Sequence, residues 1–340
     1  MKKRKALIAG IAAVGVSLSL AACSGSSQSA SSGPQKVGLA AMFLDDPFQV
    51  AMNNAVMDTS KKAGFEALPL TNANFDLAKQ LTDIRTLLDQ GINGLFVVPV
   101  DTAGMQPALD QAAERKVPII SVGNALPGAY VSVDTDNYGM AEANCKYLGD
   151  ATGGQGTILM TIGPQEVRAL NERRTGFMDC MKKNYPKITV KEFMVGPDSQ
   201  KCYDAIRTGF SSESNVVGIY VHSDAVCGTA VPNALQSIGK LAPAGDPKHI
   251  FFSGIDGSAL GHEAIRQGNM DFLTSQPAAG YGSTSANWMV KALAGDEVKT
   301  GPTDHNSEVR EVAGAKVDVL PFIEVTKKNV DDSSLWGNAR

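Results

Sequence analysis

Two adjacent carboxylates, a proline and a phenylalanine follow an apolar run in the stretch MFLDDPFQV, residues 42–50. Asp46 is a good helix N-cap and Pro47 suits the first helical position, so the spacing predicts a helix that begins at Pro47 and can run to Gly64. Phe48 then lies on the first helical turn, at the mouth of the preceding strand. An aromatic side chain at that place is either core or an apolar platform for a ligand, and the spacing alone leaves both open.

Polar residues also follow the other apolar runs that the sequence predicts to be strands. In open parallel sheets ligands bind beyond the carboxyl ends of the strands, so these positions are the candidates for a binding site. Arg173 and Arg174, near the start of a predicted helix, are either a solvated pair or a source of several donors aimed into a cleft. The strand-end candidates are 45–49, 100–102, 123–125, 163–165, 222–224, 256–258 and Gln276.

No enzymatic motif accompanies these polar residues. The sequence contains no GxSxG, no GxxxxGK[ST] and no HExxH, and His262-Glu263 lacks the second histidine. The four histidines are scattered, and for His222 at a strand end a satisfied hydrogen-bonding role is favoured over metal ligation. Gly154-Gln155-Gly156 precedes a strand and is interpreted as a turn. We therefore expect no catalytic residues, no metal and no cofactor.

Short apolar runs alternate with segments of helical periodicity. This alternation predicts an α/β protein whose buried parallel strands are joined by right-handed crossovers. One helical segment, 75–90, places its Leu and Ile side chains on a single stripe. Helical segments are also predicted at 173–185 and 225–239. The pattern restarts after 131–136, which indicates a second unit of similar size. The predicted strands are 37–43, 65–70, 94–100, 117–122, 131–136, 156–162, 188–195, 216–221, 249–255, 270–275 and 319–325.

Two doubly wound parallel-sheet lobes with a cleft between them are the economical interpretation. A predicted helix at 285–295 and the strand-like stretch at 319–325 follow the second unit, so the chain crosses between the lobes more than once and the hinge has several segments. Trp288 is interpreted as helix packing and Trp336 as part of a tail, neither with a binding role. The predicted division assigns 36–136 plus 277–318 to the N-terminal lobe and 137–276 plus 319–340 to the C-terminal lobe and tail.

Residues 1–35 are predicted to be an export signal and a flexible tether. MKKRK precedes the apolar stretch ALIAGIAAVGVSLSLAA, and Leu20-Ala21-Ala22-Cys23 resembles a bacterial lipobox, whose cysteine is lipidated. An ordinary secretory signal with a chance cysteine is the alternative. The following SGSSQSASSGPQ has almost nothing to bury. No later apolar run reaches the roughly 18 residues that span a bilayer, so we expect an extracytoplasmic protein held by lipid alone to the cell membrane, in a periplasm or on the outer cell surface.

The sequence predicts an acidic body once this leader is removed. Loss of Lys2, Lys3, Arg4 and Lys5 reduces 31 basic residues to 27 against 35 acidic residues, a net charge of −8. A field of this sign disfavours nucleic acid as a partner.

Four further cysteines remain, Cys145, Cys180, Cys202 and Cys227. An even number in an exported chain favours disulfides, and the absence of CxxC argues against zinc. Under the predicted alternation, Cys145 and Cys180 lie on helices over one face of a sheet and Cys202 and Cys227 on helices over the other. We therefore expect the pairs 145–180 and 202–227, one of three possible connectivities.

Five short motifs occur in a specific order along the chain: DDPF after the first strand, RRTGF in the second unit's first long helix, HSDAVCGTAVPNAL, GIDG and SQP. With these motifs, residues 36–328 resemble the ribose-type periplasmic sugar-binding proteins, the type I solute-binding proteins of ABC importers. The resemblance implies the periplasmic binding protein type I fold, in which a ligand in the cleft favours closure of two hinged lobes.

The resemblance also implies a set of ligand-binding residues. Asp46 and Phe48 match the polar residue and the aromatic residue that contact the sugar in that family. Arg173 resembles the arginine that donates to sugar hydroxyls from the second lobe. Asp256 in GIDG and Gln276 in SQP resemble two further hydroxyl partners.

The chain also departs from the family pattern. Gln49 replaces a second aromatic residue, and Gly123 and Asn124 stand where the family commonly carries an Asp-Arg pair. Ser223 replaces an asparagine, and an aromatic residue of the second lobe is replaced near Ser199. Because an ion pair and stacking surface are lost, these departures argue against ribose itself.

Together these features predict a monomeric substrate-binding lipoprotein that captures a monosaccharide or sugar alcohol and delivers it to the permease of an ABC importer. A sensory protein that hands its closed form to a membrane receptor would carry the same site. A secreted hydrolase that uses Asp45, Asp46 or Asp256 on a sugar-like substrate is the alternative from a different class. The expected ligand-binding residues are Asp46, Phe48, Gln49, Asn124, Arg173, Ser223, Asp256 and Gln276.

Overall fold

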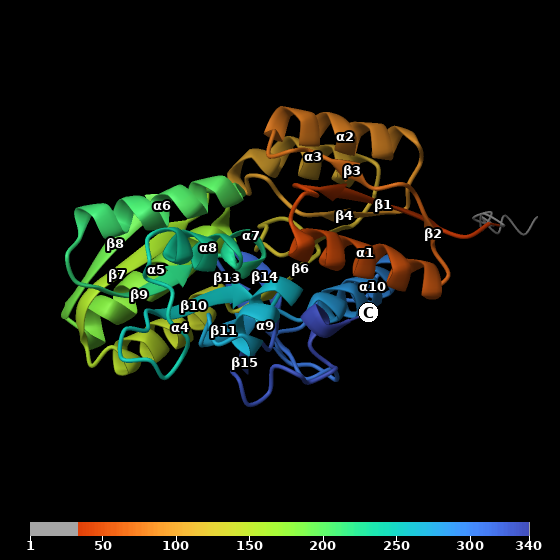
Figure 1. Ribbon diagram of the computed structural model, residues 1–340. Coiled ribbons are helices and arrows are strands. Elements are labelled where there is room, and N and C mark those ends of the chain that lie inside the picture. Colours follow the sequence, from red (N-terminus) through yellow and green to blue (C-terminus); the bar gives the residue numbers. More distant parts are fainter. Residues whose placement is uncertain (1–32, 340) are drawn as a thin grey trace, which may run out of the picture. The chain divides into compact units, whose positions relative to one another are not determined.

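The computed structural model describes residues 33–339, which contain two β-sheets, each with helices on both faces (Figure 1). The export signal, Cys23 and most of the tether lie outside the described residues. The two α/β lobes are those expected from the sequence, although each sheet is mixed at one edge.

The first sheet has the strand order β12-β13-β14-β6-β5-β4-β1-β2, with β3 also paired to β1. Its strands are parallel except for β13, which runs antiparallel to β12 and β14. The run 65–70, expected as one strand, contains only the short β2, because Pro69 has no N–H to donate; β3 begins beyond the run, at Thr71. The bounds are β1 (Lys36–Ala41), β2 (Glu66–Ala67), β3 (Thr71–Asn72), β4 (Gly94–Val97), β5 (Ile119–Val122), β6 (Val131–Thr135), β12 (Gly301–Pro302), β13 (Glu308–Val312) and β14 (Ala315–Leu320).

The second sheet has the order β15-β11-β10-β9-β7-β8 and is parallel except for β15. The stretch 319–325, expected as a single strand, is divided at Pro321 between β14 of the first sheet and β15 of the second. The bounds are β7 (Gln155–Ile162), β8 (Lys187–Met194), β9 (Val216–Val221), β10 (Phe251–Asp256), β11 (Phe272–Ser275) and β15 (Ile323–Val325).

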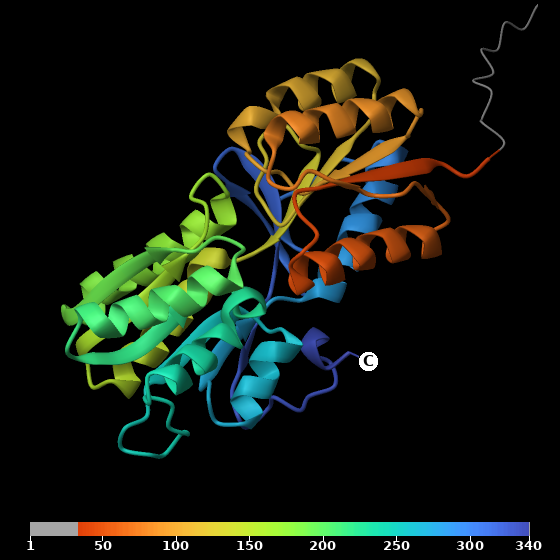
Figure 2. The ribbon, with the colours of Figure 1, turned by 45° about the horizontal axis from the view of Figure 1, so that its top comes forward.

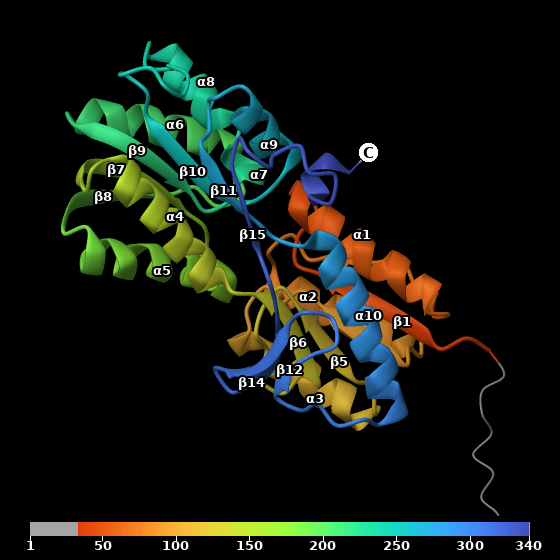
Figure 3. The ribbon, with the colours of Figure 1, turned by 90° about the horizontal axis from the view of Figure 1, so that it is seen from below.

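Four groups of helices cover the four sheet faces, as Figures 2 and 3 show from two further directions. In the first lobe α1 and α10 lie side by side on one face and α2 and α3 lie on the other; in the second, α4 and α5 cover one face and α6, α7, α8 and α9 the other. None of the helices within residues 33–339 is long and apolar enough to cross a membrane. The bounds are α1 (Pro47–Lys62), α2 (Leu77–Asp89), α3 (Gln106–Glu114), α4 (Asn137–Ala151), α5 (Arg168–Asn184), α6 (Ser199–Ser212), α7 (Asp224–Cys227), α8 (Ala230–Ser237), α9 (Ala259–Arg266) and α10 (Ala278–Ala294), with 3-10 turns η1 (Ala103–Met105) and η2 (Trp336–Asn338).

Helix boundaries differ from the expected ones at three places. α5 begins at Arg168, so Arg173 lies in its second turn, and α10 begins seven residues before the expected 285. The helical segment expected at 225–239 is split into α7 and α8. A continuous helix is excluded there because Pro232 has no N–H for the carbonyl four residues earlier and its ring would clash with that carbonyl.

Both disulfides of the second lobe are the pairs expected from the sequence. Cys145 on α4 is bonded to Cys180 on α5 with an S–S distance of 2.06 Å, and Cys202 on α6 is bonded to Cys227 on α7. The four cysteines are buried. Each bond therefore joins two helices on one face of the second sheet.

The chain passes between the two lobes three times. It leaves the first lobe between β6 and α4, returns between β11 and α10, and leaves again between β14 and β15. All three crossings lie where the carboxyl ends of β6, β11 and β14 meet the other lobe. Residues that follow these strands are therefore placed between the lobes.

Candidate ligand-binding site

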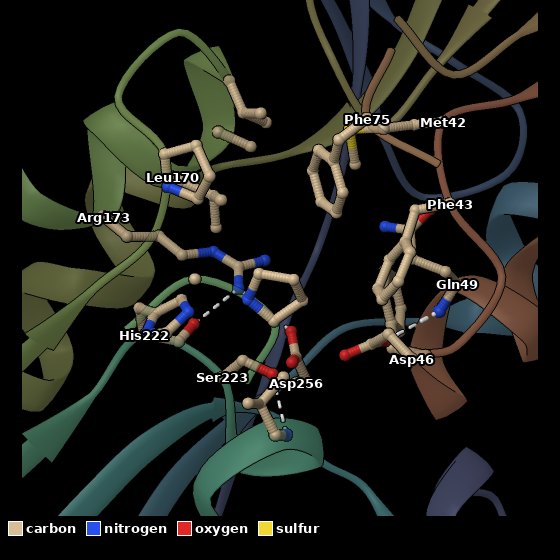
Figure 4. A pocket seen from close by; sticks show the side chains of 18 of the residues that line it. Met42, Phe43, Asp46, Gln49, Phe75, Leu170, Arg173, His222, Ser223 and Asp256 are labelled. Carbon is tan, nitrogen blue, oxygen red and sulfur yellow. Dashed lines mark hydrogen bonds and ion pairs between the residues drawn. The ribbon is translucent and has the colours of Figure 1, made fainter. Parts of the chain in front are cut away.

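A cavity lies beyond the carboxyl ends of strands from both sheets (Figure 4). All eight residues expected to bind a ligand line it. The space open to the centres of water-sized spheres is about 70 Å³. Its lining is formed by Met42, Phe43, Asp46, Phe48, Gln49, Phe75, Gly123, Asn124, Pro164, Val167, Ala169, Leu170, Arg173, Gly196, Pro197, His222, Ser223, Val226, Asp256 and Gln276.

The start of α1 brings three of the expected residues to the cavity. Asp46 is the N-cap of α1, as predicted, and accepts a hydrogen bond from the Gln49 backbone N–H at 3.0 Å. Gln49 Oε1 is buried without a hydrogen-bond partner among the described residues, so an acceptor faces the cavity unused. Phe48 packs edge-on against Tyr281 at 5.9 Å, which fixes its ring at the cavity wall. The neighbouring carboxylate Asp45 is exposed and does not line the cavity.

Asn124, which follows β5, connects the two lobes. Its side-chain oxygen accepts a hydrogen bond from the backbone N–H of Ala169 at the start of α5, at 3.1 Å. Within residues 33–339 its amide nitrogen has no protein partner, although the residue is 2% exposed. The side chain thus holds the lobes together with one atom and keeps a donor for a ligand with the other.

Arg173 is the one guanidinium at the cavity and is almost fully buried. Its Nη1 donates to Asp256 Oδ1 at 3.0 Å and to the His222 carbonyl at 2.7 Å, and its Nε donates to Asn137 Oδ1 at 2.9 Å. Nη2 has no hydrogen-bond partner in the described part of the chain. Arg174, the other member of the predicted pair, instead forms a surface ion pair with Glu192.

Asp256 at the end of β10 is the second charged group of this cluster. Gln276, at the crossing after β11, donates to its Oδ1 at 2.7 Å. The Asp256 backbone has φ 123°, a region that non-glycine residues rarely adopt and that costs about 1–3 kcal/mol. The following turn is held by Asp224, which accepts from the backbone N–H groups of Gly257 and Ser258 at 2.7 and 2.9 Å. Asp224 therefore supports the site from outside the cavity.

Ser223 and His222 follow β9. Ser223 lines the cavity and is the N-cap of the short α7. His222 also lines the cavity, and its Nδ1 lies 3.0 Å from Thr161 Oγ1, as expected for a histidine with a satisfied hydrogen bond. Burial, with the nearby Arg173 charge, lowers the pKa of His222 to about 3, so the ring is neutral.

Burial dominates the electrostatics of the carboxylates. It raises the pKa of Asp46 to about 7, and the Asp256 charge adds to the effect. It also raises the pKa of Asp256, although Arg173 opposes this rise. With two carboxylates against one guanidinium, the cavity has no excess of positive charge with which to hold an anion.

The wall of the cavity that lies across from Asp46 and Asp256 is apolar, and the sequence did not predict it. Phe43 and Phe75 contact each other with ring centroids 4.8 Å apart, and Val167 and Leu170 reach the same wall from the second lobe. Figure 4 shows Phe75 and Leu170 above the space and Asp46 and Asp256 below it. Phe75 has a left-handed backbone, φ 61°, which no periodicity predicts.

A buried network joins the site to the crossings. Gln276 Oε1 lies 3.1 Å from both Thr135 Oγ1 and the Tyr281 hydroxyl, and Tyr281 is 3.0 Å from Asp134 Oδ1. Burial raises the pKa of Asp134 to about 7. Because Gln276 also bonds Asp256, the network connects the cavity to residues at two crossings.

Trp336 corrects a further expectation. It is not part of a free tail: its ring lies 5.8 Å from that of Phe48, and its indole N–H donates to the Asp256 carbonyl at 2.8 Å. Trp288 does pack within a helix layer, and its indole N–H donates to Asp318 at 2.7 Å. The strand-end rule could not have found Trp336, because it follows no strand.

Some candidates lie elsewhere. The positions 100–102 do not reach the cavity, and of 163–165 only Pro164 lines it. Within residues 33–339, no three His, Cys, Asp or Glu side chains are grouped so that they could hold a metal ion.

Two lobes with three crossings and a cavity at the strand ends between them define a two-lobed solute-binding protein. The family model described as periplasmic binding protein domain matches residues 37–297, and the chain belongs to this family. The family consists of extracytoplasmic solute-binding proteins, not enzymes, which confirms the fold and the class expected from the sequence.

Individual relatives are similar over most of the chain. The xylitol-binding protein of Mycolicibacterium smegmatis is 28% identical over 331 residues, covering 95% of this chain and 86% of that protein. The ribose import binding protein of Bacillus subtilis is 23% identical, covering 71% and 75%.

Solved structures share the fold. A solute-binding protein of an ABC transporter from Mycobacterium smegmatis, with bound glycerol, has a TM-score of 0.76 at 23% identity and covers 88% of this chain and 96% of that one. One from Bacillus halodurans, with bound myo-inositol, has a TM-score of 0.75 at 19% identity and covers 89% and 98%.

Proposed function

We propose that the cavity binds one monosaccharide or sugar alcohol, which the protein delivers to an ABC importer. The observation that supports this proposal is that polar groups from both lobes point into the cavity and have donors and acceptors that no described residue uses. Gln49 Oε1 is a free acceptor, and Asn124 Nδ2 and Arg173 Nη2 are free donors. Because hydroxyl groups both donate and accept, a polyol satisfies this mixture.

Size and charge narrow the ligand class. The size of the cavity suits one sugar ring or a short polyol. The ligand is uncharged, because Asp46 and Asp256 face it and the only guanidinium is already paired with Asp256. The names of the relatives support this class: among them are proteins for xylitol, ribose and galactofuranose.

The apolar wall adds a directional preference. A hydroxyl buried against Phe43, Phe75 and Leu170 finds no partner there, at a cost of about 1–3 kcal/mol. The ligand therefore turns its C–H face to this wall and its hydroxyls to Asp46, Arg173 and the groups beside them.

The three crossings form the hinge in this proposal, and the lobe boundaries follow them at 136, at 276–277 and near 319–322. Asn124 and Ala169 pair only when the lobes are together, so their bond belongs to the closed state. A ligand that bridges Asp46 of the first lobe and Arg173 of the second favours that state, and the permease recognises it. The protein acts as a monomer that lipid on Cys23 tethers to the membrane.

Thermal unfolding with a ligand panel tests the function. Mature protein is heated with xylitol, D-arabitol, ribitol, erythritol, D-ribose, D-galactose and myo-inositol, and one or two of these are expected to raise the unfolding temperature. Asp46→Asn should abolish most of that shift, whereas Asp45→Asn, which changes the exposed neighbouring carboxylate, should keep it. A shift only with nucleosides or amino acids would reject the ligand class, and formation of product from the bound sugar would favour the hydrolase alternative.

A further inference from the structure

The C-terminal segment, which we define as residues 326–339, is fixed to the second lobe beside the cavity. Val330 and Leu335 are buried in the core of that lobe. Asn338 Oδ1 accepts from Arg266 Nη2 at 2.7 Å and lies 3.0 Å from His262 Nδ1, both on α9. These contacts hold the segment against the Asp256 loop, which we define as Asp256 at the end of β10 and the turn that follows it, residues 257–258.

The backbone of this segment approaches that loop very closely. A Cβ atom at Gly337 would lie 2.4 Å from the Gly257 carbonyl oxygen, so only glycine fits. The approach places the Trp336 indole N–H 2.8 Å from the Asp256 carbonyl, which also accepts from the Gln276 backbone N–H at 3.0 Å. Asp256, with its left-handed backbone, is therefore held from two sides.

The other edge of Trp336 reaches the first lobe. Its ring lies edge-on to Phe48 at 5.8 Å, on α1, and it packs on the core of that lobe. Phe48 has two aromatic neighbours, Tyr281 and Trp336. One side chain thus touches a ligand-facing residue of each lobe, although Trp336 does not itself line the cavity.

We propose that Trp336 is a positioning residue of the binding site, which couples the Phe48 ring to the Asp256 loop when the lobes are together. This inference rests on the proposed function, because it concerns ligand affinity. Opening the lobes separates Trp336 from Phe48, so the ligand-bound state gains this contact and the open state lacks it.

Trp288 provides a matched control. It is the only other tryptophan of the chain, is 6% exposed, donates its indole N–H to a protein oxygen, and lies outside the cavity. Dissociation constants are measured by calorimetry for the panel member that shifts the wild type most. We expect Trp336→Ala to weaken binding about tenfold, Trp336→Phe to recover part of the loss, and Trp288→Phe to stay within twofold of the wild type.

Fluorescence gives a readout that a merely structural role would not move. In Trp288→Phe, Trp336 is the sole tryptophan, and its emission should shift when that panel member is added. In Trp336→Phe the remaining Trp288 should not respond. Asn338→Ala, which frees the segment from α9 and keeps the indole, should weaken binding in the same direction if Trp336→Ala does not fold.

The outcomes separate the two proposals. If the wild type binds a panel member and Trp336→Ala binds it equally well, only the role of Trp336 is refuted. If Trp336 emission stays constant while calorimetry shows binding, the contact does not follow the ligand and the inference is overturned. If the wild type binds no panel member, the proposed function fails and this inference falls with it.

Discussion

Replacement of Arg173 by methionine should separate the structural role of this side chain from its role in binding. The side chains of Arg173 and Asp256 are 6% and 3% exposed and 3.0 Å apart, so the substitution leaves a buried carboxylate with only uncharged partners. Loss of one partner of a buried pair costs about 3–5 kcal/mol, which for a body of this size corresponds to a fall in unfolding temperature of roughly 5–8 °C. The protein should remain folded at 25 °C, because domains are stable by about 5–15 kcal/mol.

The stability that Arg173→Met loses should increase as the pH rises. Burial already raises the pKa of Asp256, and removing Arg173 raises it further above the value in the unfolded chain. Such a carboxyl destabilises the folded state as pH rises, so Arg173→Met should be closest to the wild type near pH 5 and furthest from it near pH 8. Urea unfolding at the two pH values measures the difference.

Two further variants test whether the unpaired Asp256 charge is the source of the lost stability. Adding Asp256→Asn to Arg173→Met removes the stranded charge and should restore at least half of the lost stability, but not ligand affinity, because Nη2 remains absent. Arg174→Met is the matched control: Arg174 pairs with Glu192 on the surface, where ion pairs contribute about 0–1 kcal/mol. Equal stability of Arg173→Met and Arg174→Met would show that no buried charge is stranded, and failure of Asp256→Asn to restore stability would show that Asp256 is not its source.

Three other outcomes are expected. The pKa of Asp46 is about 7 in the folded protein, above its unfolded value, so the ligand-free protein should lose stability between pH 4 and 7. In urea unfolding, Asp46→Asn should reduce the slope of stability against pH by up to about 1.4 kcal/mol per pH unit. Removing either disulfide should lower the free energy of unfolding by about 3–4 kcal/mol, because the closed loops span 35 and 25 residues. The variants are Cys145→Ser with Cys180→Ser, and Cys202→Ser with Cys227→Ser. A loss below 1 kcal/mol in urea unfolding would contradict this expectation. The aldonic acid of any sugar that binds should bind at least tenfold more weakly by calorimetry, and equal affinity would contradict the uncharged ligand class.

The sequence predicts the lobes and one rim of the cavity well, because those features are local. Asp46 and Pro47 begin α1 as expected, since an N-cap and a first-turn proline are encoded within two residues. The strand-end rule brings Asp46, Asp256 and Gln276 to one place, because parallel strands end at a common edge. Arg173 lies within α5 and was predicted from its place in that helix and from the family resemblance.

The apolar wall and Trp336 could not be predicted in the same way. Phe75 enters the cavity through a left-handed backbone turn, which depends on tertiary contacts and not on periodicity. Trp336 lies 80 residues from Asp256 in sequence, and its position depends on the crossing after β14 and on Asn338. The positions of Phe75 and Trp336 therefore depend on tertiary contacts that local sequence patterns do not encode.

Asn124 differs from the family pattern in sequence and also makes a tertiary contact to the second lobe. An Asp-Arg pair at 123 and 124 would add charge to a cavity that already holds Asp46, Asp256 and Arg173. The oxygen of Asn124 instead accepts from Ala169 of the other lobe, so only the amide NH2 group remains for the ligand. The affinity that an ion pair would supply must therefore come from the unused groups Gln49 Oε1 and Arg173 Nη2 and from the apolar wall. Because the chain lacks this bidentate pair, we expect ribose to bind more weakly than at least one other member of the ligand panel, and ribose as the tightest-binding member would contradict that expectation.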